Sequence, residues 1–208
     1  MQRLRSPIYV IVNHPAPRSA WDVARASLEG GAGLLQFRAK GPLGDDEAAA
    51  LRTLAGESHR MGVPLLINDS VDLAREVGAA GVHVGQSDAP IALAREALGS
   101  QAIIGMTTPT VELAQQAEAD GASYVAVGAM YPSPTKPEKP VLGPDRLRAV
   151  VDTVSLPVCA IGGITVSRVP ELLAAGASLL AVISAVSAAD DLYRAVRDLV
   201  AACDRVPR

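Results

Sequence analysis

One pattern recurs in this sequence: DGASYVAVG at residues 120–128, AGASLLAVI at residues 175–183 and, in a shorter form, GAAGVHVG at residues 78–85. In each copy a helical stretch ends at a glycine, and a run of small and apolar residues follows. The runs do not alternate apolar with polar residues, which is typical of strands buried on both faces of a parallel sheet. The repeat therefore predicts a fold built from helix, tight turn and strand.

Eight such runs lie along the 208 residues, and helical patterns with apolar residues three and four positions apart separate them. The predicted strands are residues 8–13, 34–38, 64–68, 81–85, 102–106, 123–128, 157–161 and 179–183. The predicted helices are residues 21–28, 46–60, 71–76, 91–98, 111–119, 145–151, 169–174 and 192–203. These alternating units predict one α/β domain over residues 1–208, a single-domain (β/α)8 TIM barrel. The alternative is an open, doubly wound sheet, but the GxGxxG phosphate fingerprint of that fold does not follow the first strand.

The composition excludes several classes of protein. Hydrophobic residues make up 49% of the chain and charged residues 20%, so general disorder is excluded. The net charge of −3 leaves no basic surplus for binding a nucleic-acid backbone, and no apolar run reaches the roughly 20 residues that cross a membrane. Cys159 and Cys203 lie in apolar segments, which indicates buried, reduced thiols and, without a recognisable signal peptide, a cytoplasmic protein. The sequence does not determine the oligomeric state, and a homo-oligomer stays open.

Polar side chains follow the second predicted strand, at the end where the catalytic residues of a barrel lie. Alternation along the strand points Gln36, Arg38 and Lys40 toward the barrel mouth. Two cations and an amide would bind an anion such as phosphate, which arginine can hold through two hydrogen bonds. The alternative is an ordinary set of surface salt bridges.

Two carboxylates follow the next two predicted strands. Asp69 comes directly after the strand at residues 64–68, and Asp88 follows the strand at residues 81–85. Because neighbouring parallel strands end at one rim, both carboxylates, with Asn68 beside them, could bind Mg²⁺, which prefers oxygen ligands. Taken one at a time, each aspartate could equally cap the helix that follows it.

Further candidates for anion binding follow the later strands. Thr107 offers a hydroxyl, and Lys136 lies between prolines in the irregular segment at residues 129–144. Gly163 and Ser184 lie in the loops after the seventh and eighth strands, where barrels commonly bind phosphate. The mouth is therefore predicted to hold two anion sites and a metal site.

The histidines do not form a catalytic set. His83 lies within a predicted strand and is predicted to be a core or rim group with satisfied hydrogen bonds. His14 and His59 are predicted to be surface or loop residues. The sequence shows no Ser-His-Asp set and no clear general base, which favours a reaction driven by stabilising a leaving pyrophosphate.

Six motifs together cover most of the chain. They are QFRAK (36–40), LLINDSVDLA (65–74), GVHVGQSD (81–88), YPSPTKP (131–137), AIGGIT (160–165) and VISAV (182–186). In this combination and order they resemble the thiamine-phosphate synthase family. The resemblance implies a barrel that joins a hydroxymethylpyrimidine diphosphate to a thiazole phosphate and releases pyrophosphate with Mg²⁺. It also implies that the thiazole nitrogen attacks a methylene cation, so no general base is required.

The resemblance further implies roles for individual residues. Mg²⁺ would be bound by Asp69 and Asp88. The catalytic cations would be Arg38, Lys40 and Lys136. The pyrimidine diphosphate would contact Gln36, Phe37, Arg38, Ala39, Lys40, Asn68, Thr107 and Lys136. The thiazole phosphate would contact Ser133, Pro134, Thr135, Gly163, Ile183 and Ser184.

The sequence departs from the family pattern at two positions. Ala39 stands where an acidic residue is usual, and Pro109 stands where a histidine is usual. Three alternatives stay open. One is a thiazole tautomerase-like relative, although that group depends on a histidine where Pro109 stands and tends to lose the acidic residue at Asp88. The others are a barrel aldolase that forms a Schiff base on Lys136 and a non-catalytic protein that binds thiamine intermediates.

Overall fold

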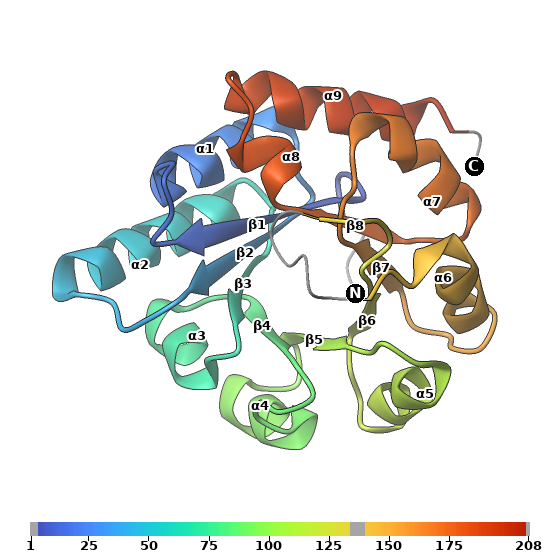
Figure 1. The fold of residues 1–208 in the computed structure, drawn as a ribbon. Coiled ribbons are helices and arrows are strands. Elements are labelled where there is room, and N and C mark those ends of the chain that lie inside the picture. The colour runs from blue at the N-terminus through green and yellow to red at the C-terminus, as the bar shows by residue number, and fades with distance from the viewer. Residues whose placement is uncertain (1–3, 134–139, 207–208) are drawn as a thin grey trace.

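Eight parallel strands close into a barrel in the computed structural model, which describes residues 4–133 and 140–206 (Figure 1). Each strand pairs with the next one in the sequence, and the last pairs with the first. The strands are β1 (Ile8–His14), β2 (Leu34–Ala39), β3 (Leu65–Asn68), β4 (Gly81–Val84), β5 (Ile103–Thr107), β6 (Tyr124–Val127), β7 (Val158–Ile161) and β8 (Leu179–Val182). The predicted single-domain (β/α)8 barrel is confirmed, and the open-sheet alternative is wrong.

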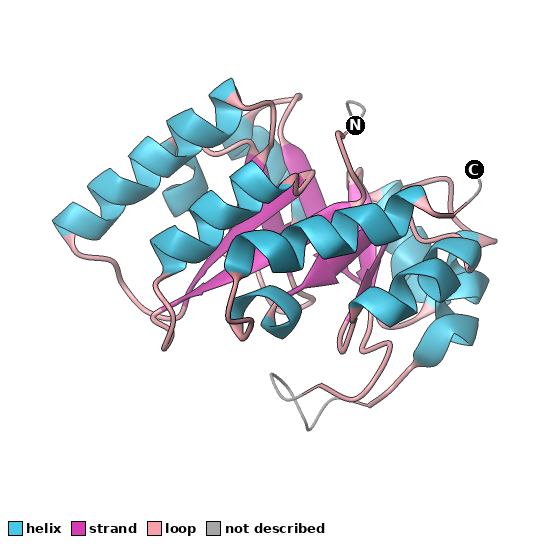
Figure 2. Cartoon of the chain, turned by 90° about the horizontal axis from the view of Figure 1, so that it is seen from above, coloured by secondary structure: helices cyan, strands magenta, loops and turns pink. Residues whose placement is uncertain are grey.

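Helices surround the strands and cover their outer face (Figures 1 and 2). They are α1 (Ala20–Gly30), α2 (Asp45–Arg60), α3 (Val71–Val77), α4 (Ile91–Leu98), α5 (Val111–Ala119), α6 (Gly143–Val151), η1 (Val166–Arg168), α7 (Val169–Ala174), α8 (Ser184–Ser187) and α9 (Leu192–Asp204). The predicted helices agree with these within a few residues, but α8 was not predicted because four residues are too few to show a helical period. Within the described residues, no helix is both long and apolar enough to cross a membrane.

Two helices begin at a side chain that caps the backbone. Ser70 and Thr110 each cap a helix, because each hydroxyl accepts a hydrogen bond from a backbone N–H three residues further on. The predicted start of the second helix at residue 46 is one residue late, since Asp45 lies in the first turn of α2 and Gly44 is the cap.

The strands bury both faces, as their apolar runs predict. Inward side chains fill the barrel with a cluster of Tyr9, Ile11, Leu34, Leu66, Tyr124, Ala126, Cys159, Leu179 and Ala181. Outward side chains pack under the helices in a second, larger cluster. Both cysteines are free thiols and buried, as predicted, and burial raises the pKa of the Cys159 thiol well above its usual range. That thiol therefore stays protonated and unreactive.

The side chain of Thr108 generates a stability prediction. It is fully buried, and its hydroxyl oxygen has no hydrogen-bond partner in the described part of the chain. Thr108→Val keeps the shape and removes the unsatisfied polar atom, so the free energy of unfolding should rise by about 1 kcal/mol in urea denaturation. Thr110→Val is the matched control, because loss of the α5 cap should instead lower stability by about 1 kcal/mol. A less stable Thr108→Val variant would show that this hydroxyl stabilises the fold.

Candidate active site

The carboxyl end of β2 presents alternate side chains to the barrel mouth. Gln36 lies deep in the interior and is 1% exposed, whereas Arg38 is half-buried at the rim. The Nη1 atom of Arg38 lies 3.5 Å from the Oδ1 atom of Asn13, which lies beside it on β1. Lys40 lies just beyond β2 and is exposed, and its backbone N–H donates to the carbonyl oxygen of His14 at 2.7 Å. The three residues of the predicted anion clamp thus run from the interior to solvent.

The other residues of the QFRAK segment face the helices. Phe37 is fully buried, and its ring stacks on Trp21 with centroids 5.4 Å apart. Ala39 packs against the same outer cluster. Phe37 and Ala39 are predicted substrate contacts, but their side chains point away from the mouth. Only their backbone groups can therefore face it. The prediction for His14 is wrong, because this residue ends β1, stacks on Phe37 and lies 2.7 Å from a carboxylate oxygen of Glu47.

Asp69 and Asp88 come together beside Asn68 at the ends of β3 and β4. The Asn68 amide donates to Asp69 Oδ2, and the backbone N–H of Gly85 donates to Asp88 Oδ2 at 2.6 Å. Neither aspartate caps a helix, since the residue at the start of α3 is Ser70 and that at the start of α4 is Pro90. The capping alternative is therefore wrong for both carboxylates. Asp69 also has a positive φ of 62°, which is uncommon for a residue with a side chain.

Burial and the neighbouring carboxylate make Asp69 harder to ionise. Desolvation, followed by the close contact with Asp88, raises the pKa of Asp69 to about 6, while Asn68 and Arg38 act in the opposite direction. A divalent cation held by the two carboxylates would offset the repulsion. No group of three or more His, Cys, Asp or Glu suited to a metal lies within the described residues. Two carboxylates fit Mg²⁺, which commonly keeps waters and substrate phosphates as its other ligands.

Thr107 ends β5 and is held at two points by the β4 segment. Its hydroxyl lies 2.9 Å from His83 Nε2, and its carbonyl oxygen accepts a hydrogen bond of 2.7 Å from the side chain of Gln86. His83 Nδ1 lies 2.8 Å from the hydroxyl of Tyr124. The prediction that His83 has satisfied hydrogen bonds is confirmed. The contact of Gln86 was not predicted, although this residue lies inside the GVHVGQSD motif.

A pocket lies on the other side of the barrel mouth, in the loops that follow β7 and β8. It is lined by Ser133, Ile161, Gly162, Gly163, Ile164, Ala181, Val182, Ile183 and Ser184. Four of these residues, Ser133, Gly163, Ile183 and Ser184, are predicted thiazole-phosphate contacts, so the fold brings them together. The short helix α8 begins at Ser184, and helix starts offer unpaired backbone N–H groups to anions. Pro134, Thr135 and Lys136 lie outside the described residues.

Gly163 allows two loops of this pocket to approach closely. Its φ is 65°, and a Cβ atom there would lie 2.5 Å from the carbonyl oxygen of Pro132. Arg168 donates to the carbonyl oxygen of Gly163 and lies 4.0 Å from the centre of the Tyr131 ring. Two loops far apart in the sequence are thereby held against each other.

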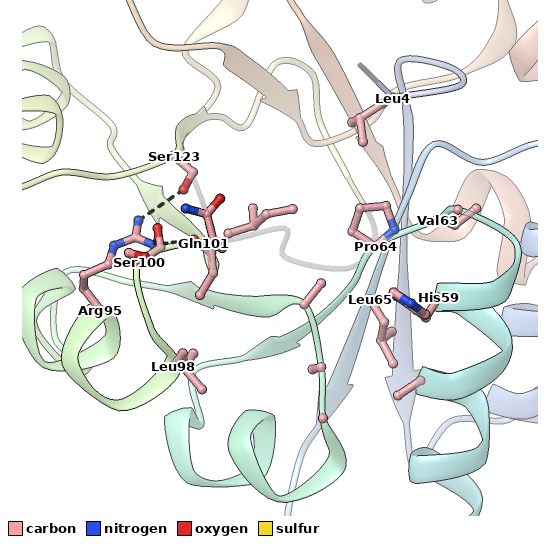
Figure 3. Close-up of a pocket in the computed structure, with 17 residues that line it drawn as sticks. Leu4, His59, Val63, Pro64, Leu65, Arg95, Leu98, Ser100, Gln101 and Ser123 are labelled. Carbon is pink, nitrogen blue, oxygen red and sulfur yellow. Dashed lines mark hydrogen bonds between the residues drawn. The ribbon is translucent and has the colours of Figure 1, made fainter. Parts of the chain in front are cut away.

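The larger cavity, of about 640 Å³, lies at the opposite end of the barrel (Figure 3). Leu4, Pro64 and Ser123 line it, and each lies just before the start of a strand. The guanidinium group of Arg95 also lines it but is bonded to several carbonyl oxygens and to Ser123. Barrel enzymes carry their chemistry at the carboxyl ends of strands, so the smaller mouth pocket is the better candidate.

Comparisons with known proteins identify the family. Residues 8–186 match the family described as thiamine monophosphate synthase. The chain belongs to this family. It is 42% identical over 207 residues to the thiamine-phosphate synthase of Natronomonas pharaonis, and the match covers 96% of this chain and 95% of that protein. It is 47% identical over 182 residues to the thiamine-phosphate synthase of Thioalkalivibrio sulfidiphilus, with 86% and 85% covered.

Solved structures agree with this membership. The thiamine phosphate pyrophosphorylase from Pyrococcus furiosus matches with a TM-score of 0.88 at 33% identity, over 98% of each chain. A 3-hexulose-6-phosphate synthase covers 94% of this chain and 99% of its own, with a TM-score of 0.72 at 20% identity, which shows the fold alone. Membership makes the chain a transferase and supports the synthase prediction, not the tautomerase-like, aldolase or binding-protein alternatives.

Gly163 and Gly62 form a matched pair for a stability test. Their φ values are 65° and 67°, but a Cβ atom at Gly62 would meet nothing within 4 Å. Gly62→Ala should lower the free energy of unfolding by about 1 kcal/mol, the cost of the left-handed backbone alone. Gly163→Ala should lose clearly more in the same urea titration, because Pro132 must move. Equal losses would show that the two loops are not in close contact in solution.

The raised pKa of Asp69 generates a pH prediction. A carboxyl with a pKa of about 6 in the folded state, against an ordinary 3.8, costs stability as pH rises through that interval. Asp69→Asn should therefore stabilise the metal-free protein at pH 7.5 and have little effect at pH 3.5. Thermal melts at both pH values measure this, with the exposed Asp72→Asn as control. Mg²⁺ at pH 7.5 should raise the wild-type melting temperature and should do so much less in Asp69→Asn. Stabilisation that is equal at both pH values would show that ionisation of Asp69 does not cause the loss.

Proposed function

We propose that this chain joins a hydroxymethylpyrimidine diphosphate to a thiazole phosphate, forming thiamine monophosphate and releasing pyrophosphate. The observation that carries the proposal is that two groups of candidate anion-binding residues lie at one barrel mouth. One is the set of Arg38, Asn68 and Thr107 with the paired carboxylates, and the other is the pocket at Gly163 and Ser184. A reaction between two phosphorylated molecules needs both. Both substrates are small molecules, and the proposal places the enzyme in the cytoplasm.

Asp69 and Asp88 would hold Mg²⁺ in this proposal. Their oxygens converge, their repulsion contributes to the raised pKa of Asp69, and they supply the hard ligands that this ion prefers. When bound, Mg²⁺ would neutralise part of the charge of the diphosphate. The amide of Asn68 holds one Asp69 oxygen in place. The backbone N–H of Gly85 does the same for Asp88, so the pair is oriented before any ligand arrives.

The residues of β2 and β5 would bind the pyrimidine diphosphate. Gln36 lies deepest and would contact the ring, whereas Arg38 and Lys40 would neutralise the diphosphate nearer solvent. Thr107 would donate its hydroxyl to the same group. Phe37 and Ala39 would contribute backbone only, since their side chains face the helices. Together with Lys136, Arg38 and Lys40 are the proposed catalytic cations, because they stabilise charge that develops on the leaving group.

The bond changes need little proton transfer. The carbon–oxygen bond of the pyrimidine methylene group breaks, and its electron pair leaves with pyrophosphate. The thiazole nitrogen then donates its lone pair to that carbon and carries no proton to remove. This agrees with the absence of a Ser-His-Asp set in the sequence. The residues act by orienting the two molecules and by stabilising charge.

The second pocket would hold the thiazole phosphate. Gly163 and Ser184 would present backbone N–H groups to its phosphate, and Ile183 would give apolar contact to its ring. Ser133 lines the same pocket, and the proposal extends the contact to Pro134 and Thr135.

A single-turnover assay with both substrates and MgCl₂ tests the proposed function. The wild-type protein should form thiamine monophosphate and pyrophosphate in equal amounts. Asp88→Asn should lower the rate by on the order of a hundredfold or more, because the protein would hold less tightly the Mg²⁺ that stabilises charge on the leaving group. Asp72→Asn, an exposed aspartate on α3, is the matched control and should keep the wild-type rate. Substrate binding without product would favour the non-catalytic alternative, and a wild-type rate for Asp88→Asn at limiting Mg²⁺ would contradict the metal assignment.

A further inference from the structure

A continuous hydrogen-bond network crosses the barrel interior beneath the mouth. The Gln36 amide donates to the hydroxyl of Tyr9, which lies 2.9 Å from the hydroxyl of Tyr124. His83 bonds to Tyr124 through Nδ1, at 2.8 Å, and to Thr107 through Nε2, at 2.9 Å. We call these five residues the interior network. It begins and ends at residues that the proposed function assigns to the pyrimidine diphosphate.

Packing holds the interior network in place. A Cβ atom on Gly105 would lie 2.1 Å from the Tyr124 ring, so only glycine at this position lets the ring cross the barrel. Tyr9 meets Tyr124 edge-on with centroids 6.0 Å apart, and His83 stacks on Tyr124 at 5.6 Å. The backbone of Thr107 is also fixed, because the side chain of Gln86 donates to its carbonyl oxygen. The network is therefore preorganised without a ligand.

The interior network has a direction that follows from counting protons. Burial raises the pKa of Tyr9 and of Tyr124 far above the usual range, so each keeps its single O–H proton. Since Tyr9 accepts from Gln36, its own proton goes to Tyr124, and the proton of Tyr124 goes to His83 Nδ1. An imidazole whose Nδ1 accepts carries its proton on Nε2. His83 then donates to the Thr107 oxygen and leaves the Thr107 proton for a ligand.

We propose that His83 is a positioning residue for the reaction: its Nε2–H orients the Thr107 hydroxyl as a donor to the diphosphate, and Tyr9 and Tyr124 set the ring tautomer. The inference rests on the proposed function. It gives a role to His83, which is not among the residues proposed to contact the substrates. At the far end, no hydrogen bond to Gln36 Oε1 is found among the described residues, and in this proposal that oxygen accepts from the ligand. The network thus favours a substrate with a hydrogen-bond donor at Gln36 and an anion at Thr107.

The opposite direction would serve a different ligand. If the Gln36 amide were reversed, the proton of Tyr9 would go to Gln36 and the proton of Tyr124 to Tyr9. His83 would then donate from Nδ1 and accept from Thr107, whose proton would no longer reach an anion. The pyrimidine diphosphate of the proposed function would carry a ring amino group as donor to Gln36 and an anionic diphosphate at Thr107, so it would select the first direction at both ends.

The tautomer can be measured without turnover. The sequence contains three histidines, so the ring nitrogens of ¹⁵N-histidine-labelled protein can be assigned by NMR with His83→Gln and His59→Gln variants. The wild-type protein should show His83 as the Nε2–H tautomer. Tyr124→Phe should weaken or abolish this preference, whereas Tyr193→Phe, an exposed tyrosine on α9, should not. A wild-type Nδ1–H tautomer would overturn the proposal, whether or not the protein forms thiamine monophosphate.

Kinetics test whether His83 acts through Thr107. A glutamine side chain places its amide near the position of Nε2, and an asparagine side chain places it near Nδ1. His83→Gln should therefore keep most of the kcat/KM for the pyrimidine diphosphate, and His83→Asn should lose on the order of tenfold to a hundredfold. In a Thr107→Val background, adding His83→Asn should lower kcat/KM by less than about a further twofold. Thr108→Val, whose hydroxyl is buried on the neighbouring residue, is the matched background in which the full loss should persist.

Each outcome of the kinetic test has one meaning. Equal losses in the Thr107→Val and wild-type backgrounds, with melting temperatures unchanged, would overturn the positioning role. Equal rates for His83→Gln and His83→Asn would overturn it as well. If the wild-type protein forms no thiamine monophosphate, the proposed function fails, and the NMR result still decides the direction of the interior network.

Discussion

The closed ring of backbone hydrogen bonds is the constraint on which the rest of this structure depends. β1 pairs with both β2 and β8, so the sheet has no free edge. In a closed parallel sheet all carboxyl ends meet at one rim, and every second residue points inward. Polar residues far apart in the sequence, such as Arg38 and Ser184, therefore reach the same mouth. No single helix or loop could bring them together.

The polar residues gathered at the mouth lower the stability of the fold. Asp69 and Asp88 lie close enough to help raise the pKa of Asp69 to about 6, and Asp69 also adopts a left-handed backbone. Below them, polar hydroxyl, amide and imidazole groups occupy an interior that other strands fill with Leu and Ala. These groups are tolerated because each has a hydrogen-bond partner. Function is thus concentrated where the barrel departs from an apolar core.

Local patterns in the sequence predict the framework because they depend on near neighbours in the chain. Apolar runs, helical spacing and glycines after helices give eight strands in the correct order, and the polar residues after each run give the candidate clamp and carboxylates. Where an element is too short for its pattern to repeat, the prediction fails. The four residues of α8 are the example. His14 was misplaced because nothing near it in the sequence indicates Glu47 as its partner.

The sequence by itself therefore determined the barrel, the order of its elements and the family-like residues at the carboxyl ends of its strands. Only the tertiary structure decided which inward residues meet across the barrel. Tyr124 occupies the same place in the repeat as Leu179, and the alternation of side chains along the strand says only that Tyr124 points inward. Contact with Tyr9 and His83 depends on the closure of the sheet and on the space left at Gly105. Such contacts join distant parts of the chain, so no local period can encode them.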